Sequence, residues 1–145
     1  MLKPGDHFEE KISFNYQDMV TFLDIVKDIN PVHRYTPQEV KEGTKRKLTV
    51  QGMFAVCMFS GILSRFFPDS VNVSRTATFV RPLWLDEEYT LSLKIRSIDR
   101  EQKIGTLKGA IKNSKGKVCI DCTTDIKNEK LFGPADDNSS ERHES

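Results

Sequence analysis

The segment from residue 52 to residue 67 constrains the fold most, because it reads as a helix that is apolar on every side. Its large apolar residues go round the whole helical circumference, and Arg65 is its single charge. A helix of this kind is a buried one, and Pro68 with Asp69 ends it. Close approach by other backbone is allowed by its small residues, which are Gly52, Ala55, Ser60, Gly61 and Ser64.

Beyond residue 70 the hydrophobic pattern changes to a period of two, which is typical of β-strands. The alternation covers residues 71–79, 89–95 and 118–126, with a weaker strand at 103–112 and a hairpin turn at 113–116. Residues 6–14 alternate loosely and predict a first strand. Short links between strands favour antiparallel pairing. We therefore expect an α+β fold in which a sheet of about five antiparallel strands curls round the long buried helix.

The segment 17–47 is predicted to be helical and to pack over one end of the sheet. A helix over 17–27 should end near Asp28, because Pro31 disfavours helix at Asn30. Thr36 starts a second short helix, and Gly43 stops it. Residues 134–145 lack core-forming side chains and predict a disordered tail, which leaves a single domain over 1–133. An open sheet edge favours a homodimer.

Composition limits the classes of function. The chain has 145 residues and a formal net charge of +1, which argues against attraction to nucleic acid or to an anionic membrane. No secretory signal is visible, and three cysteines fit reduced thiols, so a cytoplasmic location is expected. Cys119 and Cys122 form one C-x-x-C pair on a predicted strand, where they should face opposite ways. Without a second pair, no metal site is predicted.

Reactive side chains gather in one short segment, Asp28-Ile29-Asn30-Pro31-Val32-His33. Pro31 fixes the local path, and the Asn30 side chain can bond neighbouring amides as an Asx turn or cap. An ionised Asp28 beside a neutral His33 could hold a water molecule and remove its proton. From spacing alone, a common Asx-Pro turn with a surface histidine remains an alternative.

The pattern Asp28-x-Asn30-Pro31-x-His33 resembles the D-x-N-P-[LIV]-H signature of the MaoC-like dehydratase family, which includes the (R)-specific enoyl-CoA hydratases. Gln51-Gly52-Met53 resembles the family's H-G-M at the start of the central helix. Ser60-Gly61 and the stretch 79–82 match further family positions, and the resemblance covers roughly residues 4–127. It implies a hot-dog fold.

The resemblance also implies the reaction and the roles of residues. Asp28 and His33 would activate water for reversible addition to a 2-enoyl thioester, giving an (R)-3-hydroxyacyl thioester in fatty acid metabolism, with no cofactor. The Gly52 N–H would stabilise the enolate oxygen. Asn30 and Ser60 would support the site. Met53 and Phe54 would wall the acyl tunnel, although a core position remains the alternative. The substrate would be a thioester of coenzyme A or of acyl carrier protein.

Lys45-Arg46-Lys47 is a short cationic run just before the central helix. It could meet the phosphate of the thioester carrier, or it could be a solvated loop. Two other functions stay open on the same fold, namely acyl-CoA thioester hydrolysis and non-catalytic binding of acyl thioesters. Lys27 and Tyr35 flank the proposed pair, depart from the family pattern, and keep the non-catalytic alternative open.

Overall fold

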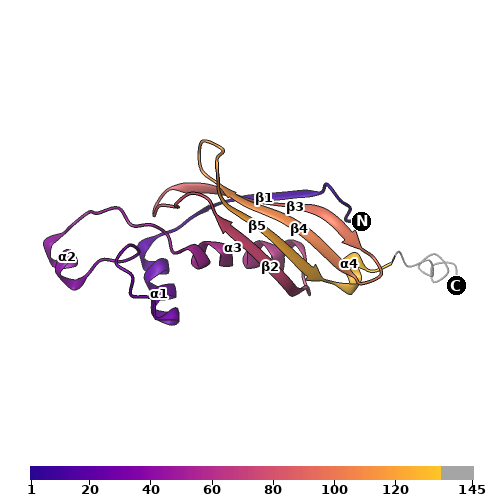
Figure 1. Cartoon of the computed structure of the whole chain (residues 1–145), viewed down its shortest axis with the longest axis horizontal. Coiled ribbons are helices and arrows are strands. Elements are labelled where there is room, and N and C mark those ends of the chain that lie inside the picture. The colour runs from indigo at the N-terminus through magenta and orange to yellow at the C-terminus, as the bar shows by residue number, and fades with distance from the viewer. Residues whose placement is uncertain (135–145) are drawn as a thin grey trace.

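A five-stranded antiparallel sheet curved over one long helix forms the body of the protein, and the computed structural model describes residues 1–134 of the chain (Figure 1). The strand order in the sheet is β1-β3-β4-β5-β2. The elements follow the chain as β1 (His7–Ser13), α1 (Tyr16–Val26), α2 (Pro37–Glu42), α3 (Gly52–Phe66), β2 (Val71–Phe79), β3 (Glu88–Asp99), β4 (Ile104–Lys112), β5 (Val118–Lys127) and α4 (Glu129–Phe132). The tail predicted at 134–145 lies, apart from its first residue, outside the described residues.

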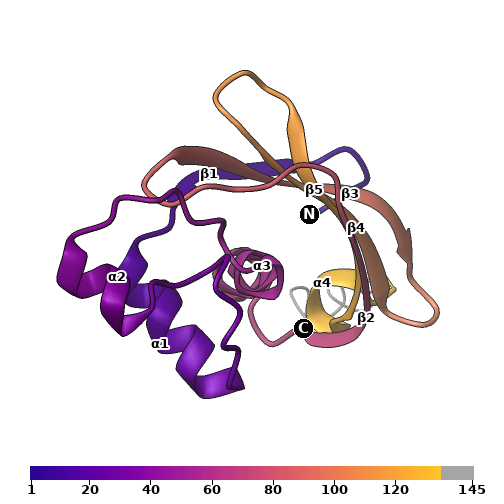
Figure 2. The ribbon, with the colours of Figure 1, turned by 60° about the vertical axis from the view of Figure 1, so that its left-hand side comes forward.

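Capping residues mark the ends of α1 and α2. The Asn15 side chain accepts a hydrogen bond from the Asp18 amide at the start of α1, and Lys27 ends that helix with a left-handed φ of 61°. Thr36 and Glu39 form a reciprocal capping box on α2, and Gly43 is left-handed at its end. Figure 2 shows α1 and α2 together beside one end of α3. The overhanging helical segment is thus confirmed.

Helix α3 contributes one face to the hydrophobic core, against the concave side of the sheet (Figure 2). Gly109 of β4 allows the closest approach, because a Cβ at this position would lie 2.6 Å from Cε1 of Phe59. The Phe59 ring therefore rests directly on the sheet backbone. The buried residues of α3 are Ala55, Val56, Phe59, Ile62 and Leu63.

The expectation that α3 is buried on every side is wrong for the single chain. Met53 and Phe66 are 53% and 42% exposed, and Cys57, Ser60 and Ser64 are exposed as well. Strand β2 pairs only with β5, so it is an edge strand, and Val71 and Val73 on it are 65% and 54% exposed. The sheet curves over only one side of α3, which leaves an apolar surface along the other side and the β2 edge.

Two details of the strands differ from the sequence prediction. Cys119 and Cys122 are both buried, whereas regular alternation would place them on opposite faces. The β4–β5 register shifts between Ile111 and Lys112 and skips Cys119, and this irregularity turns the Cys119 thiol to the inward side that Cys122 already faces. The short helix α4 was not predicted, and its four residues are too few for a periodic pattern. Within residues 1–134, no helix is long and apolar enough to cross a membrane.

Candidate active site

The segment from Asp28 to His33 is a compact turn directly after α1. The Asp28 amide donates to the Leu23 carbonyl over 2.9 Å and so closes the end of the helix. Asp28 Oδ1 accepts a hydrogen bond from the Asn30 amide at 2.9 Å, and Asn30 Oδ1 accepts from the Val32 amide at 3.2 Å. The His33 amide donates to the Asn30 carbonyl at 3.1 Å. The predicted Asx turn is present, and Asp28 and His33 lie at its two ends.

Thr49 orients the His33 ring. Nδ1 of His33 lies 2.8 Å from the Thr49 carbonyl oxygen, which can only accept a hydrogen bond. This contact assigns the proton to Nδ1 and leaves Nε2 as the acceptor on a neutral ring. The Thr49 amide in turn donates to the Val32 carbonyl at 3.0 Å, and Thr49 forms an isolated bridge with Trp84. Thr49 is sixteen residues from His33, and no sequence motif pointed to it.

Gln51 connects the turn to the start of α3. Its Nε2 lies 3.5 Å from Oδ2 of Asp28, and its Oε1 accepts a hydrogen bond from the Phe54 amide at 2.8 Å. Asp28 and His33 form no direct hydrogen bond or ion pair with each other, and both side chains are partly exposed. The extended residues Thr49 and Gln51 contact the histidine and the carboxylate respectively.

Gly52 is the first residue of α3, where a helix amide has no intrahelical acceptor. No residue in 1–134 accepts a hydrogen bond from its N–H. Gly52 lines a hollow of about 330 Å³ together with the stretch from Phe79 to Leu83. A Cβ at Gly52 would lie 2.6 Å from Cε1 of Phe79, so the glycine lets the Phe79 ring pack against the start of α3. Asp28 and His33 do not line it; Gln51 connects the two places along the chain.

Two other residues predicted for the site lie elsewhere. Phe54 packs between Phe22 and Phe14, with ring centroids 5.1 Å and 5.5 Å away, and this is a core position. Ser60 Oγ accepts from Arg75 of β2 at 3.3 Å and lines a separate hollow beyond the other end of α3. In the single chain the structure does not bring Ser60 to the Asp28–His33 turn, because eight helical residues separate it from Gly52 by about 12 Å.

The three residues of the basic run, Lys45, Arg46 and Lys47, differ in their contacts. Arg46 forms an ion pair with Glu39 at 2.9 Å and donates to the carbonyl oxygens of Pro31 and Arg34. The Arg46 guanidinium is the main reason that the pKa of Glu39 falls from 4.5 to about 2. The Tyr35 hydroxyl donates to the Arg46 carbonyl at 2.6 Å. Arg46 is thus a structural clamp on the segment after the turn, and the phosphate-binding expectation is not supported for it.

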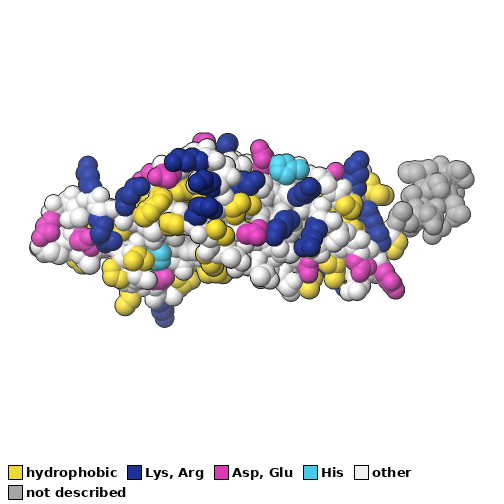
Figure 3. Space-filling model, turned by 45° about the horizontal axis from the view of Figure 1, so that its top comes forward, with side chains coloured by type: hydrophobic (Ala, Val, Ile, Leu, Met, Phe, Trp, Pro, Cys, Tyr) yellow, Lys and Arg dark blue, Asp and Glu magenta, His cyan; other side chains and the backbone are white. Residues whose placement is uncertain are grey.

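Lys45 and Lys47 remain exposed beside the loop between β2 and β3. Lys47 lies 3.7 Å from a Glu87 carboxylate oxygen and 4.7 Å from the centroid of the Trp84 ring. Figure 3 shows Lys and Arg side chains interspersed with apolar groups over one face of the molecule. The small net charge of the chain therefore coexists with local basic surface.

Comparison by sequence finds no matching family model. The chain is 31% identical over 88 residues to a mitochondrial 3-hydroxyacyl-[acyl-carrier-protein] dehydratase of Arabidopsis thaliana, covering 61% of this chain and 52% of that protein. It is 26% identical over 98 residues to a mitochondrial dehydratase of the same name from Solanum lycopersicum, covering 68% and 59%. The chain thus spans between half and three fifths of these curated relatives.

Comparison of structures identifies the fold. An (R)-hydratase from A. caviae superposes with a TM-score of 0.76 at 22% identity, covering 87% of this chain and 96% of that one. An R-hydratase from Pseudomonas aeruginosa gives 0.75 at 20% identity, with 93% and 84% covered. A MaoC-like dehydratase from Rhodospirillum rubrum gives 0.69 at 15% identity, with 86% and 91% covered. The chain has the hot-dog fold of these proteins, and the predicted resemblance is confirmed at the level of fold.

Proposed function

We propose that this protein catalyses the reversible hydration of 2-enoyl thioesters to (R)-3-hydroxyacyl thioesters in fatty acid metabolism. The observation that supports the proposal is the hydrogen-bonded turn that carries both Asp28 and His33, with Nδ1 of His33 bound to the Thr49 carbonyl at 2.8 Å. The hydratase and dehydratase names of the relatives agree with it. An isolated surface histidine would need no such fixed orientation.

The proposed mechanism uses the two side chains on one water molecule. The neutral His33 ring accepts a proton at Nε2, and the carboxylate of Asp28 holds the water by its other hydrogen and stabilises the resulting imidazolium. The hydroxyl adds to C3 of the enoyl group, and the protonated pair returns a proton to C2. The reverse sequence expels water from the 3-hydroxyacyl thioester. Every proton taken from water is thereby returned to the product.

Addition at C3 transfers negative charge to the thioester oxygen, and a fixed donor must meet that charge. The Gly52 amide suits this role because it starts α3 and has no acceptor among residues 1–134. Its partial positive charge is reinforced by the positive end of the α3 helix dipole. We assign the Gly52 N–H as the oxyanion donor, with the acyl chain running past Met53.

A homodimer belongs to this proposal. The β2 edge and the uncovered side of α3 expose the apolar side chains of Met53, Val71, Val73 and Phe79, and exposed strand edges pair readily. A second copy related by a two-fold axis would cover both the strand edge and the helix. We further propose a cytosolic location, while noting that both curated relatives are named as mitochondrial proteins.

The decisive experiment incubates the purified protein with crotonyl-CoA. Absorbance of the conjugated double bond and release of free thiol are followed in parallel. Loss of the double bond without thiol release is expected. Release of thiol instead would identify a thioesterase, and a protein inert toward crotonyl-CoA and crotonyl-acyl carrier protein alike would be a binding protein, contrary to the proposal.

A further inference from the structure

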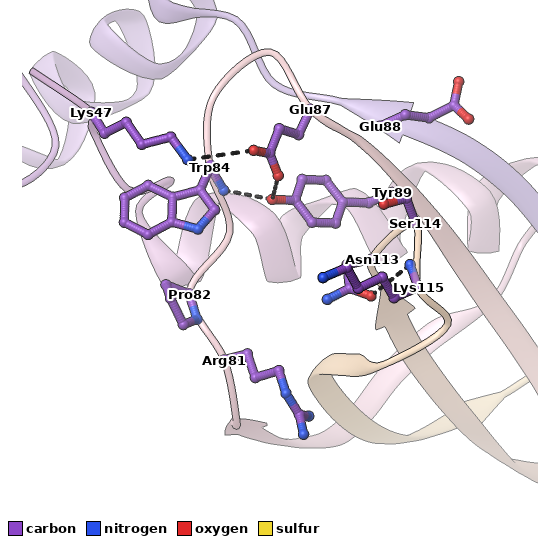
Figure 4. A pocket seen from close by; sticks show the side chains of 10 residues that line it. All are labelled: Lys47, Arg81, Pro82, Trp84, Glu87, Glu88, Tyr89, Asn113, Ser114 and Lys115. Atoms are coloured by element: carbon purple, nitrogen blue, oxygen red, sulfur yellow. Dashed lines mark hydrogen bonds and ion pairs between the residues drawn. The ribbon is translucent and has the colours of Figure 1, made fainter.

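A second hollow of about 560 Å³ lies beside the first, between the loop that precedes β3 and the hairpin that joins β4 to β5 (Figure 4). Three cationic side chains line it, contributed by three separate parts of the chain: Lys47, Arg81 and Lys115. Trp84, the single tryptophan of the sequence, forms one wall. Only the tertiary fold brings these four residues together.

The positive charge of this hollow is only partly balanced. Glu87 is already engaged, by Lys47 at 3.7 Å and by the Tyr89 hydroxyl at 3.3 Å. The Glu88 side chain points away in Figure 4 and lies 3.9 Å from Lys11 on β1. Among residues 1–134, neither Arg81 nor Lys115 has a carboxylate partner. The hollow therefore offers two uncompensated cations to an anion.

Trp84 is held in place as a flat apolar wall. Its amide donates to the Tyr89 hydroxyl at 2.6 Å, and Tyr89 is buried in the core at 2% exposure. The indole is half-buried, and the Lys47 ammonium lies over its ring, 4.7 Å from the centroid. An ordered indole next to cations is suited to a planar base attached to phosphate, because bases stack on aromatic rings irrespective of sequence.

The two hollows adjoin. Both are lined by Arg81 and Pro82, and the first also contains Gly52. A ligand can thus extend from the proposed oxyanion donor, along the stretch between Phe79 and Trp84, into the cationic hollow. We propose that this hollow binds the phosphorylated nucleotide end of coenzyme A, so that coenzyme A is the thioester carrier. This inference rests on the proposed function and adds Arg81, Trp84 and Lys115 to the residues of the site.

An acyl carrier protein also presents a phosphate, but it carries no planar base. The placement of the cations around an indole favours the nucleotide over a carrier protein, which would need a broad basic surface and no stacking wall. Both carriers present a phosphate, but only the binding of coenzyme A should depend on Trp84. This difference can be measured.

The test compares Lys115→Glu and Trp84→Leu with the matched control Lys117→Glu, which changes the same charge on the same hairpin outside the hollow. Substrates are crotonyl-CoA, crotonyl-pantetheine, which lacks the nucleotide, and crotonyl-acyl carrier protein. We expect KM for crotonyl-CoA to rise about fivefold in each test variant, equivalent to roughly 1 kcal/mol. KM for crotonyl-pantetheine should not change, and the control should resemble the wild type. Titration calorimetry with coenzyme A alone should show the same loss of affinity.

Binding and turnover separate the two proposals. If no thioester is turned over but coenzyme A binds and Lys115→Glu weakens it, the nucleotide site holds and the hydratase proposal fails. If crotonyl-CoA is turned over and neither variant changes its KM, the nucleotide site is wrong. A rise in KM confined to crotonyl-acyl carrier protein would likewise overturn the coenzyme A assignment. Lys115 is exposed on a turn, so its substitution does not endanger folding.

Discussion

The carbonyl oxygen of Thr49 lies 2.8 Å from Nδ1 of His33, and the Thr49 hydroxyl lies 3.2 Å from the same atom. A carbonyl oxygen has no proton to give, so the ring must donate from Nδ1 whenever it is neutral. We expect nitrogen NMR of the protein above neutral pH to show His33 protonated on Nδ1. An Nε2-protonated ring would remove Nε2 as the proton acceptor and with it the proposed mechanism.

The first kinetic prediction concerns the pair itself. Asp28→Asn and His33→Ala should each lower kcat for crotonyl-CoA hydration by about a hundredfold or more, because each removes a group that holds or deprotonates the water. The matched controls are Asp24→Asn on α1 and His7→Ala on β1, which should keep near-normal rates. Circular dichroism and thermal melting check that the fold is intact. Near-normal turnover in either test variant would eliminate the pair.

The second concerns the Gly52 amide, which no side-chain deletion can remove. Gly52→Val should lower kcat, because its new side chain meets Phe79 and fills the space that the thioester must enter. The exposed Phe79 ring can turn aside, so the melting temperature should change little. Gln51→Ala should instead act on stability, since it removes a helix cap, with a drop of roughly 4 °C. Unchanged kcat in a folded Gly52→Val protein would refute the oxyanion assignment.

The third prediction addresses assembly. Light scattering should give twice the chain mass of 16.6 kDa at micromolar concentration. Val73→Lys, on the exposed β2 edge, should shift the protein to the monomer, because it places a charge in the apolar contact. Val40→Lys on α2 is the control for an equally exposed valine and should leave the dimer unaffected. A wild-type monomer would contradict the prediction.

The fourth follows from the lowered pKa of Glu39, which the Arg46 hydrogen bond brings from 4.5 to about 2. A carboxyl with a depressed folded-state pKa stabilises the fold above the unfolded-state pKa and loses that contribution as pH falls. Glu39→Gln should therefore lower the melting temperature at pH 7, and the difference from wild type should vanish as pH drops from about 4.5 to 2. Glu42→Gln, on the same helix, is the control. A difference that persists at pH 2 would show that packing, not charge, is responsible.

Local signals in the sequence were enough to place most elements and the core of the candidate site. The capping box of Thr36 and Glu39 acts over three residues, and the Asx turn of Asn30 acts over two. Such bonds form within a short stretch of chain whatever the rest of the molecule does. The turn that carries Asp28 and His33 was predictable for this reason, as was the change of period that separates α3 from the strands.

Contacts between residues far apart in the sequence depend on how the strands of the sheet pair. The Thr49 carbonyl meets His33, and Lys47, Trp84 and Lys115 converge, because strand pairing brings separate segments together at one end of the molecule. Likewise the apolar pattern of α3 could not show which side the sheet would cover, since hydrophobicity specifies burial but not the partner. The inward position of Cys119, on the same side as Cys122, depends on a register shift that alternation alone does not encode. Hydrogen bonds within a turn or a helix cap depend on residues that are neighbours in the sequence. Strand register and side-chain packing depend instead on the free energy of the whole sheet.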